Sequence, residues 1–171
     1  MEVKKIVIEN LLSVDKQITY MVNGKSMLPM IIPNQDLVTI RSKKPNEVFK
    51  EDDVVLYRQK GKLTLHRIVG VRPNKEYILL GDNCSRKEYG ISDNDIIGLL
   101  IRFKHNGCSY TVDAPEYMDY VKSLRNHRSI RQYTKLLYDI IIRHFTFLQT
   151  KRYIIARRFL YSMIVFKIRF D

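Results

Sequence analysis

At 171 residues, the chain is long enough for one domain with a real hydrophobic core and a short appendage. Its 45% hydrophobic and 28% charged residues are typical of a globular protein and exclude wholesale disorder. Two cysteines are too few for a disulfide framework or a cysteine-rich zinc site. No stretch approaches the roughly 18 uninterrupted apolar residues of a membrane-spanning helix.

Positive charge gathers at the C-terminal end. Residues 1–120 hold 18 Lys/Arg against 16 Asp/Glu, whereas residues 121–171 hold 12 against 2. The excess therefore belongs almost entirely to the last part of the chain, which we interpret as an electrostatic appendage on a near-neutral domain. The N-terminal residues carry acidic side chains and lack a long apolar core, so no cleavable signal peptide is expected.

The first two thirds of the chain have the pattern of a β-protein. Residues 3–12 are compatible with a short helix. Between about residues 17 and 112, short apolar or alternating runs are separated by turn residues. This spacing favours a compact, mostly antiparallel sheet or barrel over an alternating βαβ fold. Seven runs look like strands: ITYMV, DLVTIR, DVVLYR, LTLHRIVGV, EYILLG, DIIGLLIRF and SYTV.

The pattern becomes helical after Pro115. Apolar residues then recur at three- and four-residue spacing with Lys and Arg between them, which predicts basic amphipathic helices. A second amphipathic stretch is predicted from about residue 151 to 168. We therefore divide the chain into a β-domain, residues 1–114, which contains the candidate residues for chemistry described next, and a basic amphipathic helical tail, residues 115–171.

Ser26, in the stretch VNGKSMLPM, is the first candidate for chemistry. A serine hydroxyl is a poor nucleophile unless a neighbouring group accepts its proton. His66, in LTLHRIV, is the candidate base, because an imidazole in mid-strand beside apolar residues has a lowered pKa and stays neutral. Taken alone, each residue is more often a turn serine or a packing histidine, so the interpretation depends on the motifs around them.

Six motifs follow one another along residues 17–112: GKSMLPM, PNQDLVTI, EDDVVLYR, LTLHRIV, YILLGDN and NDIIGLLI. Their order resembles that of signal-peptidase-like serine peptidases, whose fold also serves the self-cleaving SOS repressors. Most members use a Ser-Lys dyad, but His66 stands at the lysine position here. The chain therefore resembles the Ser-His branch of endoplasmic-reticulum and sporulation-type signal peptidases. The resemblance implies a serine endopeptidase that cleaves a precursor or leader peptide and needs neither cofactor nor metal.

The resemblance also implies an acidic partner for His66. Asp82 matches the aspartate of the Gly-Asp-Asn motif, and Glu88 lies near the next acidic position, where the family has aspartate. Such an acid orients the imidazole and stabilises its protonated form. Asp82 could instead cap the turn in which it lies, so both acids stay candidates.

Gly24 and Pro29 are expected to shape the turn that carries Ser26. Gly24 would permit a close backbone approach or a positive φ, and Pro29 would stiffen the turn. The Ser26 backbone N–H is the expected oxyanion donor. Many signal peptidases have a second donor, a serine hydroxyl, where this chain has Gly24.

Two family glycines are also replaced, by Gln35 and Asp52. These departures favour an alternative function, a catalytically degenerate module of the same fold that binds a peptide or a membrane surface.

Residues 121–171 have three possible roles: docking on an anionic membrane surface, contact with nucleic-acid phosphates, or a helical hairpin packed on the sheet with a solvated basic face. The resemblance favours the first, because signal peptidases work at a membrane. We therefore expect a peripheral protein at the cytoplasmic membrane. The expected substrate is an extended peptide that adds as a strand beside residues 18–25 and 53–58.

Overall fold

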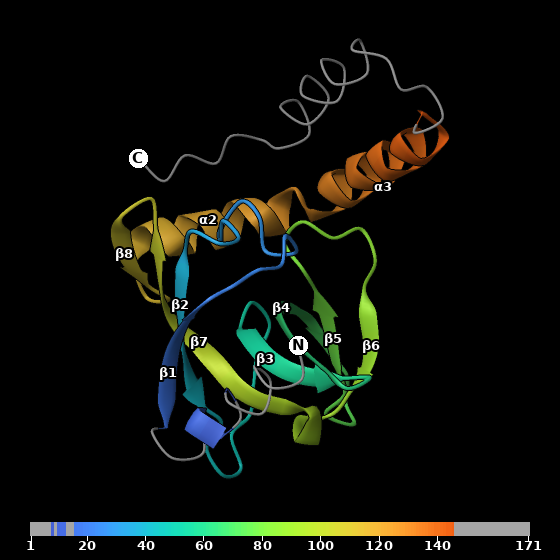
Figure 1. Cartoon of the computed structure of the whole chain (residues 1–171). Helices are drawn as coiled ribbons and strands as arrows, with labels where there is room; N and C mark the ends of the chain where they lie inside the picture. Colours follow the sequence, from blue (N-terminus) through green and yellow to red (C-terminus); the bar gives the residue numbers. More distant parts are fainter. Residues whose placement is uncertain (1–7, 9, 13–15, 146–171) are drawn as a thin grey trace.

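The computed structural model describes residue 8, residues 10–12 and residues 16–145 (Figure 1). Eight strands form one antiparallel sheet, and helices follow it, so the predicted mostly antiparallel β-fold with C-terminal helices is confirmed. The strands are β1 (Gln17–Met21), β2 (Leu37–Ser42), β3 (Val54–Gln59), β4 (Lys62–Val71), β5 (Tyr77–Leu80), β6 (Glu88–Ile91), β7 (Ile96–His105) and β8 (Cys108–Thr111). A short 3₁₀ turn, Asp93–Asp95, precedes β7.

Strand β6 has no counterpart among the seven predicted strands. It is four residues long, and Gly90 within it has a φ of 74°, so it lacks the alternating apolar pattern of its neighbours. Ile8 and the segment 10–12 are helical, as predicted for residues 3–12. The predicted helix over 151–168 lies outside the described residues.

The sheet runs in the order β1-β2-β7-β3-β4-β5-β6, with β8 paired to the far half of β7. β3 pairs with β4 along its length and with β7 at Val55–Tyr57. Over Val55–Tyr57 this strand has a partner on each side and offers no free edge, so the addition of a peptide beside residues 53–58 stays a prediction only for the residues outside this overlap. Within the described residues, β1 pairs only with β2 and keeps one edge open.

Two helices cover one end of the sheet, α2 (Pro115–Asn126) and α3 (Arg128–Phe145) (Figure 1). α2 begins at the predicted boundary, but it does not stand apart from the β-domain. It buries Tyr117, Tyr120, Val121 and Leu124 in the same core as β1, β2 and β7, at the spacing of one helical face. The division into two domains stays a prediction; the packing joins α2 to the first of them.

A second core lies between β3, β4, β5 and the start of β7, and it contains Val55, Tyr57, Ile68 and Tyr77. None of the helices in the described part of the chain is long and apolar enough to cross a membrane.

Candidate active site

Ser26 lies in the turn between β1 and β2, and its side chain is half-buried. A second turn, Gly81–Cys84 after β5, holds this turn in place. The Asn83 N–H donates to the Ser26 carbonyl oxygen at 2.7 Å, and the Asn83 side-chain amide donates to the Lys25 carbonyl at 3.1 Å. The Ser26 N–H donates to no hydrogen bond within the described residues, so it is available to an oxyanion.

Gly81 is where the Ser26 turn and His66 meet. A Cβ atom added at Gly81 would lie 2.7 Å from the Ser26 carbonyl oxygen, 2.9 Å from His66 Nε2 and 2.8 Å from Cys84 Sγ. These distances are shorter than any real Cβ contact, so only glycine fits. The Ser26 carbonyl oxygen and His66 Nε2 lie 2.7 and 2.9 Å from this same Cβ position, so the Ser26 turn is next to the imidazole.

We expect Gly81→Ala to disrupt the site. The added methyl group must push the Ser26 turn and the imidazole apart, so we expect a loss of about 1–3 kcal/mol in the free energy of unfolding, together with loss of activity. The matched control is Gly24→Ala, whose Cβ would meet only Ser26 Oγ, at 4.0 Å. Urea denaturation of both variants checks this; equal midpoints would contradict the tight approach at Gly81.

His66 is fixed by the β3–β4 hairpin. The two-residue turn Lys60–Gly61 sets the register, in which Val55 faces His66 and Tyr57 faces Thr64. Because paired residues share a face and alternate residues along a strand do too, Tyr57 and His66 lie on one side of the sheet. His66 is only 5% exposed.

One ring nitrogen of His66 is held by Tyr57 and Glu88. His66 Nδ1 lies 3.0 Å from the Tyr57 hydroxyl oxygen and 3.5 Å from Glu88 Oε1. The Tyr57 hydroxyl in turn donates to Glu88 Oε2. Because the Tyr57 hydroxyl proton is donated to Glu88, the Tyr57 oxygen can only accept a hydrogen bond from His66. Nδ1 therefore carries the imidazole proton, and Nε2, on the side of Gly81 and Ser26, is unprotonated.

Burial sets the ionisation of this cluster. It lowers the pKa of His66, against the opposing effect of the Glu88 and Asp82 carboxylates, so the imidazole is neutral at pH 7. Burial and the hydrogen bond to Glu88 raise the pKa of Tyr57, which therefore remains a donor. A neutral imidazole with its free nitrogen beside a serine is the arrangement that a general base requires.

Asp82 has a different set of partners. It forms a two-pronged ion pair with the fully buried Arg67, whose Nε and Nη2 lie 2.9 and 2.7 Å from its two oxygens. It also accepts from the Tyr120 hydroxyl of α2 at 2.8 Å. Of the two predicted acids, the structure brings Glu88 to the imidazole and directs Asp82 to Arg67 and α2.

Asp52 occupies a glycine position of the family for a structural reason. Its φ is 75°, in the left-handed region that glycine adopts most readily. Its carboxylate pairs with Arg125 of α2 and lies 3.5 Å from Arg128 of α3, so the aspartate fastens both helices to the sheet. Gln35, which replaces the second family glycine, does not have a positive φ. The residue before it, Asn34, does, at 60°.

The expected role of Gly24 needs correction. Its φ is not positive, and the only neighbour of an added Cβ is Ser26 Oγ at 4.0 Å, so the fold does not require glycine there. Pro29 lies in the Ser26 turn after a cis peptide bond from Leu28.

Within the described residues no hydrogen bond links Ser26 Oγ to His66, and no group of three or more His, Cys, Asp or Glu could hold a metal ion.

Tyr57, Gly81 and Arg67 are the site residues that sequence reasoning missed. Tyr57 could have been found from the KGK hairpin. A two-residue turn at Lys60–Gly61 fixes the register of the two strands, and this register places Tyr57 on the same face as His66.

Comparison with known proteins identifies the family of the chain. No curated protein matches the chain. The family model described as Peptidase S24-like matches residues 3–101, more than half of the chain, and this range contains Ser26, His66, Asp82 and Glu88. The predicted relationship to the SOS-repressor-like serine peptidases is thereby confirmed, and the chain belongs to the Peptidase S24-like family.

Proposed function

We propose that the protein is a serine endopeptidase of the signal-peptidase type, in which Ser26 is the nucleophile and His66 the general base. The observation that carries this proposal is the position of His66 between two groups. Its Nδ1 is held by Tyr57 and Glu88, and its Nε2 lies at Gly81, against the Ser26 turn. Family membership supports hydrolysis by a serine peptidase in general.

The proposed reaction uses each group in turn. Ser26 Oγ attacks the peptide carbonyl while Nε2 takes its proton, and Glu88 stabilises the resulting imidazolium through Nδ1. The Ser26 N–H donates to the oxyanion. His66 then gives its proton to the leaving amine, and the acyl-enzyme is hydrolysed by a water that His66 activates. Catalytic hydrogen bonds of this kind often tighten only when substrate binds, so the proposal does not require a Ser26–His66 hydrogen bond among the described residues.

The substrate is proposed to bind extended along the open edge of β1, where backbone hydrogen bonds can form without disturbing the sheet. This strand leads directly into the Ser26 turn. Signal peptidases prefer small residues before the cut, and we propose the same preference for this precursor or leader peptide.

The pH profile tests the roles of His66 and Glu88. Only neutral His66 accepts a proton, so activity falls as the pH drops through its pKa, which burial holds below 6.5. Glu88→Gln removes a charge that raises this pKa. The acid limb of kcat/KM should therefore move to lower pH, and the plateau should fall by about 10²-fold because the imidazolium loses its partner.

Glu116→Gln is the control for that profile, since Glu116 is exposed in the first turn of α2 and lies on a different element from His66, Tyr57 and Glu88. An acid limb that stays in place or moves upward in Glu88→Gln would remove Glu88 from the proposed role.

A second function, the degenerate binding module, is favoured by two observations: Ser26 Oγ has no hydrogen bond to His66 in the described structure, and Gly24 supplies no hydroxyl donor. This module would bind extended peptides without cutting them. Peptide binding by the wild-type protein, with no product by mass spectrometry, would support it against the peptidase.

We also propose that the C-terminal part of the chain docks on an anionic membrane surface. α3 exposes a run of apolar side chains, Ile130, Tyr133, Leu136, Leu137 and Ile140, and residues 121–171 hold 12 Lys/Arg against 2 Asp/Glu. Apolar groups that enter the interface and basic groups that meet lipid headgroups are the two contributions to such binding.

Vesicle sedimentation tests this docking. Each basic residue near the surface contributes about 1 kcal/mol, so we expect binding to anionic vesicles at low salt and release at high salt. Neutral vesicles are the control for lipid charge, and Tyr133→Asp with Leu137→Asp should weaken binding through the apolar face. Equal sedimentation with neutral and anionic vesicles would contradict the proposal.

A further inference from the structure

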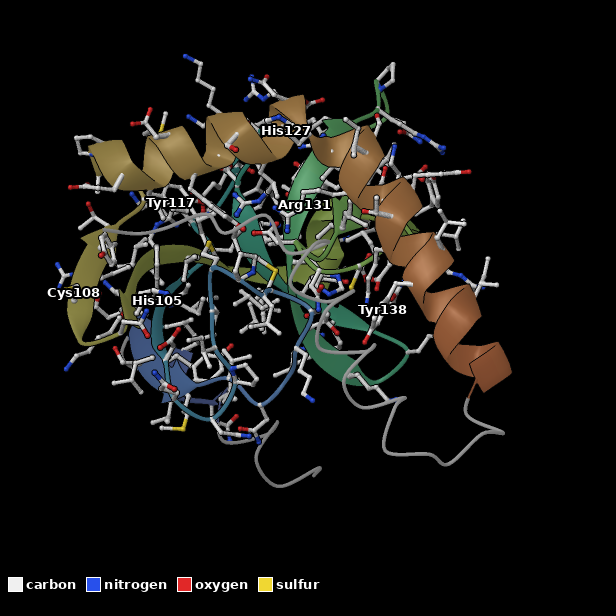
Figure 2. The ribbon with its side chains drawn as sticks, turned by 90° about the horizontal axis from the view of Figure 1, so that it is seen from above. His105, Cys108, Tyr117, His127, Arg131 and Tyr138 are labelled. Carbon is white, nitrogen blue, oxygen red and sulfur yellow. The ribbon has the colours of Figure 1, made fainter. Side chains whose placement is uncertain are left out.

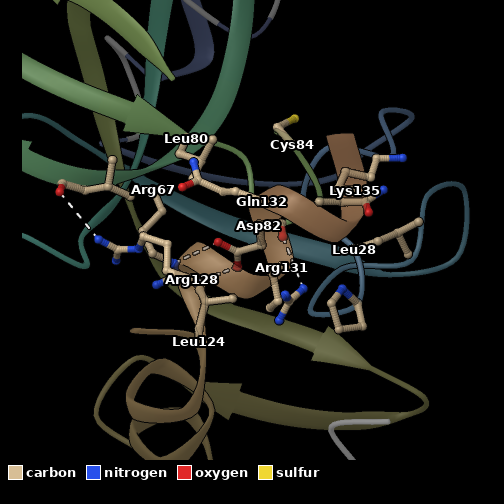
Figure 3. A pocket seen from close by; sticks show the side chains of 13 residues that line it. Leu28, Arg67, Leu80, Asp82, Cys84, Leu124, Arg128, Arg131, Gln132 and Lys135 are labelled. Carbon is tan, nitrogen blue, oxygen red and sulfur yellow. Dashed lines mark hydrogen bonds and ion pairs between the residues drawn. The ribbon is translucent and has the colours of Figure 1, made fainter. Parts of the chain in front are cut away.

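A cavity beside the candidate active site is lined by basic side chains (Figure 3). It lies between the Ser26 turn, the Gly81–Cys84 turn and α3, and we call it the Arg131 pocket. It leaves about 40 Å³ for the centres of water-sized groups. Because one water needs about 10–15 Å³ on this measure, the space suits a group of about three heavy atoms. Its polar lining includes Asp82, Asn83, Arg128, Arg131, Gln132 and Lys135.

Positive charge in this pocket exceeds negative charge. Among the residues that line the pocket, Asp82 has the one carboxylate, and both of its oxygens already accept hydrogen bonds from Arg67. Arg128 reaches the Val69 carbonyl and Asp52 only at 3.5 Å each. Seen from above, Arg131 projects from the first turns of α3 toward the sheet (Figure 2).

Arg131 has a donor without an acceptor. Its Nη2 donates to the Asp82 carbonyl oxygen at 3.1 Å, which anchors the guanidinium on the Gly81–Cys84 turn. Its Nη1 is buried and has no hydrogen-bond partner in the described part of the chain. Buried donors of a charged group are nearly always satisfied, so a buried guanidinium N–H at a pocket wall calls for a hydrogen-bond acceptor.

The pocket is joined to the nucleophile turn. Leu28 and Pro29 line it, and so does Asn83, whose N–H and side chain hold the Ser26 and Lys25 carbonyls. The pocket therefore adjoins the turn that carries Ser26. A carboxylate has three heavy atoms and accepts from two donors, which matches both the size of the space and the pair Arg131 and Arg128.

We propose that the Arg131 pocket binds the carboxylate of an Asp or Glu side chain of the substrate and so sets the cleavage specificity. This inference rests on the proposed peptidase function. The bound carboxylate accepts from Arg131 Nη1 and from Arg128, and the apolar wall formed by Leu28, Leu80 and Leu124 packs against the methylene groups of the same side chain.

Cleavage of a proteome-derived peptide library is the first test. The wild-type protein should cut peptides that carry Asp or Glu at one fixed position near the cut. For the best such peptide, Glu→Gln in the substrate or Arg131→Gln in the protein should each lower kcat/KM by about tenfold or more. Combining the two changes should cause little further loss. Arg125→Gln, exposed on α2 and outside the pocket, is the matched control.

A binding test separates this inference from the peptidase proposal. Acetate, inorganic phosphate and anionic vesicles are titrated separately into Ser26→Ala protein while the arginine side-chain Nε–H signals are followed by NMR. A saturable shift of the Arg131 signal with acetate, absent in Arg131→Gln, supports the pocket even if no peptide is cut. A library cleaved without acidic preference, no shift with acetate, or a response to phosphate or vesicles alone would overturn it.

Discussion

Replacing Ser26 or His66 by alanine is expected to lower peptide cleavage by about 10³-fold or more, and the double variant should be no slower than either single variant. The two side chains act as one unit, since an alkoxide cannot form without a base and the base has no other substrate proton to accept. A pool of precursor peptides with anionic lipid present provides the assay.

Matched controls exist for both substitutions. Ser109 on β8 and His127 after α2 are exposed and lie outside the candidate site, so Ser109→Ala and His127→Ala should keep full activity. The Ser26→Ala substitution should lower the free energy of unfolding little, because Ser26 is half-buried in a turn and loses no side-chain hydrogen bond within the described residues. His66→Ala should lower it more, because it removes a buried imidazole that is hydrogen-bonded to Tyr57, so its folding is checked by urea denaturation. Cleavage that survives both substitutions would exclude the dyad.

Replacing Arg67 by methionine is expected to lower the free energy of unfolding by about 3–5 kcal/mol, the largest stability effect we foresee. Arg67 is 0% exposed, and it donates to Asp82, the Asp52 carbonyl and the Tyr117 hydroxyl. Its guanidinium also lies over the rings of Tyr117 and Tyr120. Without it, the buried Asp82 carboxylate loses the ion-pair partner that donates to both of its oxygens.

The second variant isolates the charge. Arg67→Met combined with Asp82→Asn removes the uncompensated carboxylate, so it should recover a large part of the lost stability. Arg72→Met is the control, because its ion pair with Glu76 is exposed and contributes about 0–1 kcal/mol. Urea denaturation gives all three values; a loss below about 1 kcal/mol for Arg67→Met would contradict the account of this network.

The strands and the motif residues could be predicted from the sequence because both depend on local pattern. Strand β4 is found from its apolar run, and Ser26 and His66 are found from ordered motifs. Strand β6 could not be predicted because Gly90 interrupts its pattern. The position of Glu88 opposite Leu79 of β5 depends on that strand, so it could not be predicted either. That pairing, and not the spacing from the Gly-Asp-Asn motif, carries Glu88 to the imidazole.

The role of Asp82 could not be predicted either, because it depends on a side chain of a different element. Asp82 and Arg67 come together where β4 pairs with the end of β5, with Arg67 opposite Leu80. Tyr120 of α2 then completes the cluster from outside the β-domain. No pattern within the GDN motif distinguishes an aspartate that steadies a histidine from one that pairs with a buried arginine.

The most direct test of the Ser26/His66 site is labelling with a fluorophosphonate, a reagent that reacts with activated serines, followed by intact-mass and peptide mapping. We predict one adduct per chain, located on Ser26 in the wild-type protein and absent from both Ser26→Ala and His66→Ala. An adduct on another serine, equal labelling of Ser26 in His66→Ala, or no adduct on the folded wild-type protein would contradict a serine nucleophile activated by His66.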